Sequence, residues 1–133
     1  MIVLDASAVL EFLLRTPIGL KVARRIAPAD ETLHAPHLID LEVAQVLRRR
    51  EASRTLSHSR AEQALADFSD LDMARYPHDV LLPRIWALRK NVTAYDAAYL
   101  ALAEALEAPL LTTDAKLARA SGHRTRVEVV ATA

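Results

Sequence analysis

Short apolar runs alternate with longer segments of helical periodicity along the chain. Ile2, Val3 and Leu4 form the first continuous apolar run, which is typical of a strand buried on both faces. The pattern predicts strands at residues 2–4, 32–35, 71–76, 110–113 and 127–130. It predicts helices at residues 6–14, 38–52, 57–69, 79–89, 93–106 and 115–120, and one more after Pro17. This alternation favours an α/β fold with a mostly parallel sheet covered by helices on both faces.

The overall length and the ends of the segments indicate one domain. A chain of 133 residues is long enough for one hydrophobic core, and its prolines fall between periodic segments, so we expect residues 1–133 to form a single unit. No apolar run is long enough to cross a bilayer, and the opening MIVLDAS has no feature of a leader peptide. We therefore expect a cytoplasmic protein without membrane contact.

Composition excludes several kinds of active site. The chain has no cysteine, so disulfides, thiolate metal sites and cysteine nucleophiles are excluded. Gly19 and Gly122 are the only glycines, which argues against a glycine-rich phosphate loop or a dinucleotide fingerprint. The 17 basic and 17 acidic residues balance, so a nucleic-acid site must be local. Arg48, Arg49 and Arg50 could contact RNA phosphates, or they could simply be a solvated helix end favoured by the helix dipole.

Aspartates end two of the predicted strands. Asp5 follows the run 2–4 and Asp114 follows the run 110–113. Functional groups of parallel sheets gather beyond the carboxyl ends of the strands, where both carboxylates would lie. The alternative is that each aspartate is a helix N-cap, a position that this residue type favours.

Two further acids lie in apolar helical segments. Glu42 is flanked by Leu38 and Val46 on its helical face, so its carboxylate needs a partner or a bound cation. A salt bridge to Arg49 on the same face would also satisfy it. Asp96 lies within the nearly all-apolar segment TAYDAAYLALA and raises the same question.

The polar and aromatic residues of this helical segment could also have purely structural roles. Asp96 could lie with Glu107 on one exposed stripe of the helix, with Glu104 near its margin. Tyr95 and Tyr99 are expected in the core rather than as platforms for stacked bases.

Together the four acids predict a cation site. Asp5, Glu42, Asp96 and Asp114 come from two strand ends and two helices that a parallel fold can bring together. Oxygen ligands without histidine or cysteine suit Mg²⁺ or Mn²⁺, which also bind phosphate oxygens. A metal-bound water can attack a phosphodiester bond, so we predict phosphodiester hydrolysis.

The chain resembles the PIN-domain ribonucleases and, among them, the VapC-type toxins of bacterial toxin–antitoxin pairs. The resemblance spans the chain and rests on three ordered segments: IVLDASAVL, APHLIDLEVAQVLRR and TAYDAAYLALAEALEAPLLTTDAKLA. It implies a three-layer α/β/α fold and an active site formed by the same four acids. It further implies endonucleolytic cleavage of RNA with Mg²⁺ or Mn²⁺, a homodimer, and inhibition by a small antitoxin in a groove that leads to the active site.

The resemblance also assigns supporting residues. Ser7, Thr112 and Thr113 match the supporting hydroxyls of the family. Gln45 stands where these toxins often carry asparagine, so an amide is kept but with a different reach, which affects only how Glu42 is oriented.

Two other functions compete with a ribonuclease. A receiver-like domain that accepts phosphate on aspartate would have similar length, but the chain lacks an acidic pair after the first strand and a lysine at the end of a late strand. A PIN-like RNA-binding or assembly module without catalysis is the other alternative. Magnesium-dependent RNA cleavage would distinguish the ribonuclease from both.

Overall fold

The strands form one sheet in which every neighbouring pair is parallel. In the computed structural model, which describes residues 1–131, the strands are β1 (Ile2–Leu4), β2 (Leu33–Pro36), β3 (Met73–Tyr76), β4 (Leu110–Thr112) and β5 (Val127–Val129). Their order is β3-β2-β1-β4-β5, so β1 lies at the centre and pairs Val3 with both His34 and Leu110. The predicted parallel sheet is therefore confirmed.

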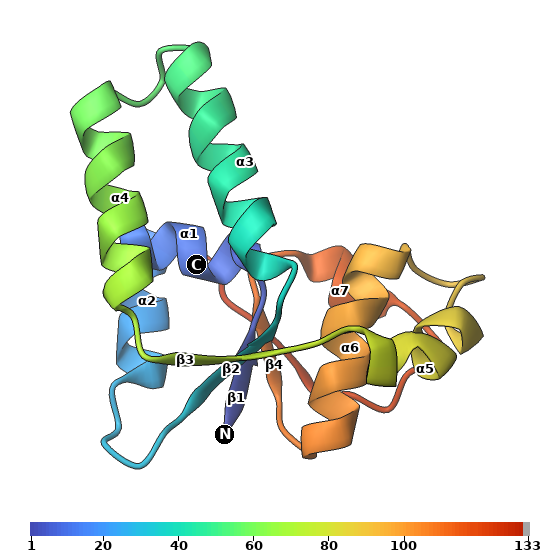
Figure 1. Ribbon diagram of the computed structural model, residues 1–133. Coiled ribbons are helices and arrows are strands. Elements are labelled where there is room, and N and C mark those ends of the chain that lie inside the picture. Colours follow the sequence, from blue (N-terminus) through green and yellow to red (C-terminus); the bar gives the residue numbers. More distant parts are fainter. Residues whose placement is uncertain (132–133) are drawn as a thin grey trace.

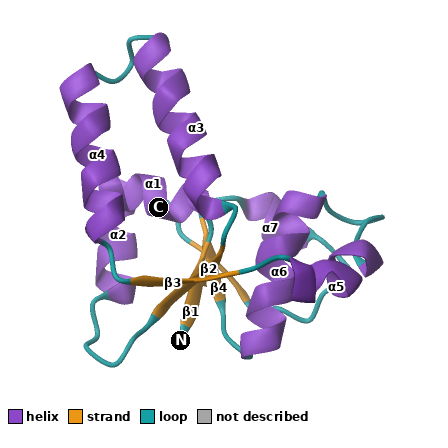
Figure 2. Cartoon of the chain, viewed as in Figure 1, coloured by secondary structure: helices purple, strands orange, loops and turns teal. Residues whose placement is uncertain are grey.

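Helices cover both faces of this sheet. They are α1 (Ala6–Leu13), α2 (Pro17–Ile26), α3 (Ile39–Ala52), α4 (His58–Asp70), the 3-10 turn η1 (Asp79–Leu81), α5 (Leu82–Ala87), α6 (Ala94–Leu106) and α7 (Ala115–Arg119). α1 and α2 lie on one side of the sheet, and α5 and α6 lie on the other (Figure 1; Figure 2). The three-layer α/β/α architecture is the one that the sequence predicts.

Side chains cap the first turns of several helices. An oxygen of each capping side chain accepts a hydrogen bond from a backbone N–H two or three residues later, which satisfies a donor that has no partner inside the helix. The capping residues are Asp5, Thr16, Ser57, Thr93 and Asp114. Two of the acids predicted to form the active site are therefore also helix caps.

The helix α6 packs closely on the centre of the sheet. Every residue from 97 to 103 is buried, and the helix contacts β1, β2 and β4. Four of these seven residues are alanines, whose small side chains let the helix lie close to the strands. A short connection leads from α6 into the start of β4, so the first turn of α6, which holds Asp96, lies at the carboxyl edge of the sheet.

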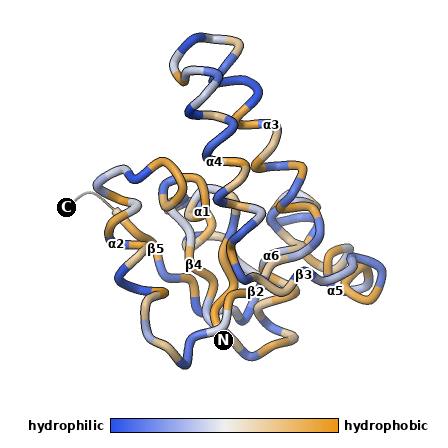
Figure 3. Tube along the Cα trace, turned by 60° about the vertical axis from the view of Figure 1, so that its left-hand side comes forward, coloured by the Kyte–Doolittle hydropathy of each residue, from blue (hydrophilic) through white to orange (hydrophobic). Residues whose placement is uncertain are grey.

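The helices α3 and α4 form a hairpin that extends beyond the sheet (Figure 1). Hydrophobic residues concentrate in the strands and at the base of this hairpin, whereas its outer end is largely hydrophilic (Figure 3). The outer end therefore adds little to the core. Among residues 1–131, no helix combines the length and the apolar character needed to cross a membrane.

Two predictions for the second half of the chain were wrong. Residues 79–89 do not form one helix, because Pro83 stands in the first turn of α5 and separates it from η1. Tyr95 is 67% exposed rather than part of the core, since it lies on the outer side of the first turn of α6. Glu104, which one alternative placed near the margin of an exposed stripe, is of intermediate burial, and its side chain is only 7% exposed and pairs with Arg84.

Candidate active site

The four predicted acids are carried by four different elements at one edge of the sheet. Asp5 directly follows β1, and Asp114 follows β4 after one intervening residue. Glu42 and Asp96 lie in the first turns of α3 and α6. Helix starts carry partial positive charge, which favours carboxylates there.

Asp5 is held by three hydrogen bonds. One carboxylate oxygen accepts from the Ser7 hydroxyl at 2.6 Å and from the Ala8 backbone N–H at 3.0 Å. The other accepts from the Thr112 hydroxyl at 2.5 Å. Burial raises the pKa of Asp5, these hydrogen bonds oppose the rise, and the charge of Asp96 adds to it. Two of the predicted supporting hydroxyls thus fix the orientation of this carboxylate.

Thr112 connects Asp5 to Asp114. Its hydroxyl oxygen also accepts a hydrogen bond of 3.0 Å from the Asp114 backbone N–H, and the Asp114 carboxylate in turn accepts from the Lys116 N–H at 2.9 Å. The backbone N–H of Thr113 donates to the Ser7 hydroxyl at 3.0 Å. The end of β4 is therefore tied to the end of β1 by side chains as well as by the strand pairing.

Glu42 receives its hydrogen bond from a residue that the sequence analysis assigned to the core. The hydroxyl of buried Tyr99 donates to Glu42 at 2.6 Å. Gln45 is exposed and forms no hydrogen bond with Glu42 in the described chain, and Glu42 forms no ion pair with Arg49 there. Tyr99 lies one helical turn after Asp96, so α6 contributes both an acid and the group that orients a second acid.

The four carboxylates lack cationic partners. Within residues 1–131 none of them forms an ion pair, whereas the half-buried Glu128 and the buried Glu104 are each paired with an arginine. Burial raises the pKa values of Asp5, Glu42 and Asp96, and the charges of neighbouring acids raise them further. Negative charge therefore accumulates at this edge, and a cation would relieve it.

The donor set suits a hard divalent cation. All four side chains offer oxygen, which Mg²⁺ and Mn²⁺ prefer. No three histidine, aspartate or glutamate side chains in residues 1–131 lie close enough together to hold one ion directly. Because Mg²⁺ keeps several waters and takes only one or two carboxylates directly, the arrangement fits an ion that is held partly through water.

Comparison with known proteins identifies the family. Residues 2–122 match the model of the PIN domain. The chain belongs to the PIN-domain family. It is similar to Ribonuclease VapC12 of Mycobacterium tuberculosis, with 41% identity over 131 residues that cover 98% of this chain and 100% of the relative. It is also similar to Ribonuclease VapC9 of the same organism, with 45% identity over 117 residues and 88% of each chain covered.

Two solved structures share the fold. PAE2754 from Pyrobaculum aerophilum superposes with a TM-score of 0.67 at 22% identity and covers 96% of this chain and 83% of its own. VapBC2 from Rickettsia felis, solved with a DNA fragment from its promoter, gives a TM-score of 0.70 at 13% identity over 97% and 98% of the two chains. At these identities the likeness concerns the fold alone.

Two hollows of this PIN domain open beside the acids. The first, of about 570 Å³, is lined by Glu42 together with Arg49 and Arg50, whereas Arg48 does not line it. The second, of about 610 Å³, is lined by Asp96 and Asp114. Only two of the three predicted arginines therefore lie beside Glu42, because the side chains of consecutive helix residues point about 100° apart.

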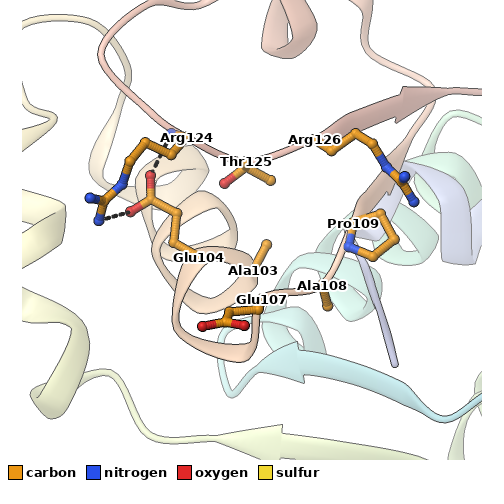
Figure 4. A pocket seen from close by; sticks show the side chains of 8 residues that line it. All are labelled: Ala103, Glu104, Glu107, Ala108, Pro109, Arg124, Thr125 and Arg126. Atoms are coloured by element: carbon orange, nitrogen blue, oxygen red, sulfur yellow. Dashed lines mark hydrogen bonds and ion pairs between the residues drawn. The ribbon is translucent and has the colours of Figure 1, made fainter.

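A further hollow of the PIN domain lies at the opposite edge of the sheet. It has a volume of about 590 Å³ and lies where the end of α6 meets the segment before β5 (Figure 4). Arg84 donates to both carboxylate oxygens of Glu104 at 2.7 and 3.1 Å, and the Arg124 N–H donates to Glu104 at 2.7 Å. The paired charges at this edge connect α5, α6 and the segment before β5, so they stabilise the fold and do not form a cation site.

Proposed function

We propose that this PIN-domain protein is a metal-dependent endoribonuclease and the toxin of a toxin–antitoxin pair. The observation that carries the proposal is the group of four acids without cationic partners at the carboxyl edge of the sheet. Relatives of nearly the same length that are named ribonucleases support it. Hydrolysis of RNA phosphodiester bonds is the reaction that a cation bound by these acids could support and that the names of the relatives indicate.

The acids hold the cation, and their neighbours keep them in place. Asp5, Glu42, Asp96 and Asp114 would bind Mg²⁺ or Mn²⁺. When bound there, the ion would supply a water of lowered pKa and would stabilise charge on the phosphate oxygens. Ser7 and Thr112 orient Asp5, and Tyr99 orients Glu42, which lines the first hollow.

Arginines beside the acids would bind the RNA backbone. Arg49 and Arg50 line the hollow that contains Glu42, and their planar guanidinium groups suit phosphate. Arg48 lies outside that hollow, so we assign it no phosphate contact. This narrows the predicted arginine triplet to two residues.

The cognate partner would be a small antitoxin protein, and the toxin itself would be a homodimer. VapBC2, the toxin–antitoxin complex of similar fold, supports the first point. Exposed apolar side chains next to the acids support the second, since Leu41 is 76% and Tyr95 is 67% exposed. Light scattering should report a dimer, and the double substitution Leu41→Glu and Tyr95→Glu should yield a monomer.

The test of the function is cleavage of mixed cellular RNA by the purified protein. We expect cleavage with Mg²⁺ or Mn²⁺ and none with EDTA, and mapping of new 5′ ends after brief expression should name the target RNA. Loss of cleavage in Asp96→Asn would assign the activity to this site. Binding of RNA without cleavage under all metal conditions would instead support a non-catalytic PIN-like module, and phosphorylation by acetyl phosphate would support a receiver.

A further inference from the structure

The chain has no net charge, yet its charges are unevenly paired. Away from the acids, arginines form ion pairs with carboxylates: Arg25 with Glu31 and Glu128, Arg75 with Asp40, Arg84 with Glu104, and Arg126 with Glu128. The basic residues that line the two hollows beside the acids form no ion pair within residues 1–131. They are Arg49, Arg50, Arg89, Lys90, Lys116 and Arg119. These six make up half of the 12 lysines and arginines that form no ion pair within residues 1–131, and they lie beside the acids.

These six unpaired basic residues divide into two groups, one on each side of the acids. Arg49 and Arg50 line the hollow between α1 and α3. The other four, Arg89, Lys90, Lys116 and Arg119, line the hollow formed by the start of α6 and by α7.

The two hollows lie next to each other at the acidic residues. Thr113 lines the first hollow, and its neighbour Asp114 lines the second. Glu42 of the first hollow and Asp96 of the second are close enough for the charge of Asp96 to affect Glu42. A chain molecule that extends from one hollow into the other would therefore pass beside the acids.

We propose that the two hollows form one path for single-stranded RNA. Arg49 and Arg50 bind phosphates on one side of the scissile bond, and Lys90, Lys116, Arg89 and Arg119 bind phosphates on the other. This inference rests on the proposed function, and it adds a second group of binding residues that the sequence motifs do not mark.

A polyanion fits this distribution of charge better than an isolated phosphate does. Cation-bound acids in the middle would receive the phosphate that is cleaved, while free basic side chains on both sides neutralise the phosphates that flank it. An aromatic surface also lies next to the second hollow, beside its lining residue Arg89. Trp86 is 67% exposed, and the Arg89 guanidinium lies 4.6 Å from the centre of its ring. Unpaired bases can stack on such a surface, whereas bases inside a duplex cannot.

The test measures binding of a 16-nucleotide RNA of mixed sequence in EDTA, where no metal-dependent cleavage occurs. Two double variants each remove two positive charges: Arg49→Gln with Arg50→Gln, and Lys90→Gln with Lys116→Gln. The control double variant, Arg15→Gln with Arg24→Gln, removes two charges that are also unpaired in residues 1–131 but lie outside both hollows. Binding is followed by fluorescence anisotropy over a range of salt concentrations.

We expect each hollow variant to flatten the plot of log affinity against log salt by about 1.4, which is about 0.7 for each lost phosphate contact. The two changes should add to about 2.8 in the quadruple variant, and the control should keep the wild-type slope. Fluorescence of Trp86, the only tryptophan in the chain, should be quenched by the RNA. The quench should weaken when Lys90 and Lys116 are replaced and persist when Arg49 and Arg50 are replaced.

The direction of the path is tested with two shortened forms of an RNA substrate, one truncated on the 5′ side of its cleavage site and one on the 3′ side. With each shortened substrate, one double variant should no longer affect the cleavage rate, whereas the other should affect it as before. A Lys90 and Lys116 variant with the wild-type salt slope would overturn the path even if the protein cleaves RNA. If each lost contact flattens the plot of log affinity against log salt by about 0.7 but the protein never cleaves RNA, the proposed function is overturned and the RNA path still stands.

Discussion

The Tyr99 hydroxyl donates a hydrogen bond of 2.6 Å to Glu42, which lies 57 residues earlier in the chain. The bond joins the helix that covers one face of the sheet to the start of α3. Because Tyr99 is 2% exposed, its hydroxyl has no access to bulk water and uses the carboxylate as its acceptor. Glu42 is thereby kept in one orientation beside the other acids.

Replacing Tyr99 with phenylalanine should therefore impair activity without disrupting the fold. The ring still fills its buried site, but Glu42 loses the group that orients it. Loss of such a supporting contact typically weakens metal affinity or activity by about 10–100-fold. Cleavage rates measured against Mg²⁺ concentration should show a higher half-saturating concentration. The matched control is Tyr95→Phe, since Tyr95 is exposed on the same helix; equal Mg²⁺ curves for both variants would exclude a role for the Tyr99 hydroxyl.

Asp96→Asn should leave a folded protein with RNA cleavage lowered by at least about tenfold. The amide keeps the size of the side chain but binds the cation more weakly than a carboxylate. Circular dichroism checks the fold, and the initial rate of cleavage in Mg²⁺ checks the effect. Glu107→Gln changes charge in the same way at the exposed end of the helix and should cleave at the wild-type rate. A wild-type cleavage rate in Asp96→Asn would show that Asp96 is not part of the active site.

Asp5→Asn should stabilise the metal-free protein at neutral pH. Burial raises the folded pKa of Asp5 above its unfolded value of about 3.9. The folded state therefore holds more protons, and the wild type loses stability as pH rises from that value through the folded pKa. Asparagine removes this charge, and it can still cap α1 because it is itself a favoured N-cap.

The same variant should respond weakly to magnesium. In the wild type, Mg²⁺ at 100 times its dissociation constant adds about 2.7 kcal/mol, and protons compete less at pH 7.5 than at pH 5. Scanning fluorimetry in EDTA and in Mg²⁺ at both pH values measures this, with Asp30→Asn as an exposed control. If Asp5→Asn is less stable in EDTA and keeps the full Mg²⁺ response, Asp5 acts only as a cap.

Glu104→Gln should weaken the fold at the edge opposite the acids. The arginine partner lowers the pKa of Glu104, so its contribution is present above the unfolded value of about 4.3 and disappears as pH falls through the lower folded value. Loss of hydrogen bonds to a buried charge costs about 2 kcal/mol. Urea unfolding should show that difference at pH 7 and a smaller one at pH 3, while the cleavage rate of the folded protein stays unchanged. A pH-independent difference would mean that packing rather than charge is responsible.

Local pattern was enough to predict most of the fold. Apolar runs marked β1 and β4 most clearly, because these strands are buried along their whole length in the sheet. The same logic located Asp5 and Asp114, since an aspartate after a buried strand lies at the sheet edge whether or not it also caps a helix. In this protein both aspartates do cap helices, so the two interpretations are compatible.

Side-chain partners could not be predicted in the same way. The pairs Tyr99 with Glu42 and Arg84 with Glu104 depend on the distance between separate elements, which helical periodicity does not contain. One signal was available: a buried tyrosine needs an acceptor, and Tyr99 lies on the same side of its helix as Asp96. The exposure of Tyr95 follows from its place in the first turn, before α6 meets the sheet.

The placement of β4 next to the central strand has a consequence for synthesis of the protein. Chains emerge from the ribosome with the N-terminus first, so β1 and β2 are available to pair long before β4. A chain that ends before residue 110 contains Asp5, Glu42 and Asp96, but it lacks both Asp114 and the Thr112 hydroxyl that holds Asp5. A nascent chain therefore presents all four acids together, with the hydroxyl that holds Asp5, only after β4 and Asp114 have left the exit tunnel.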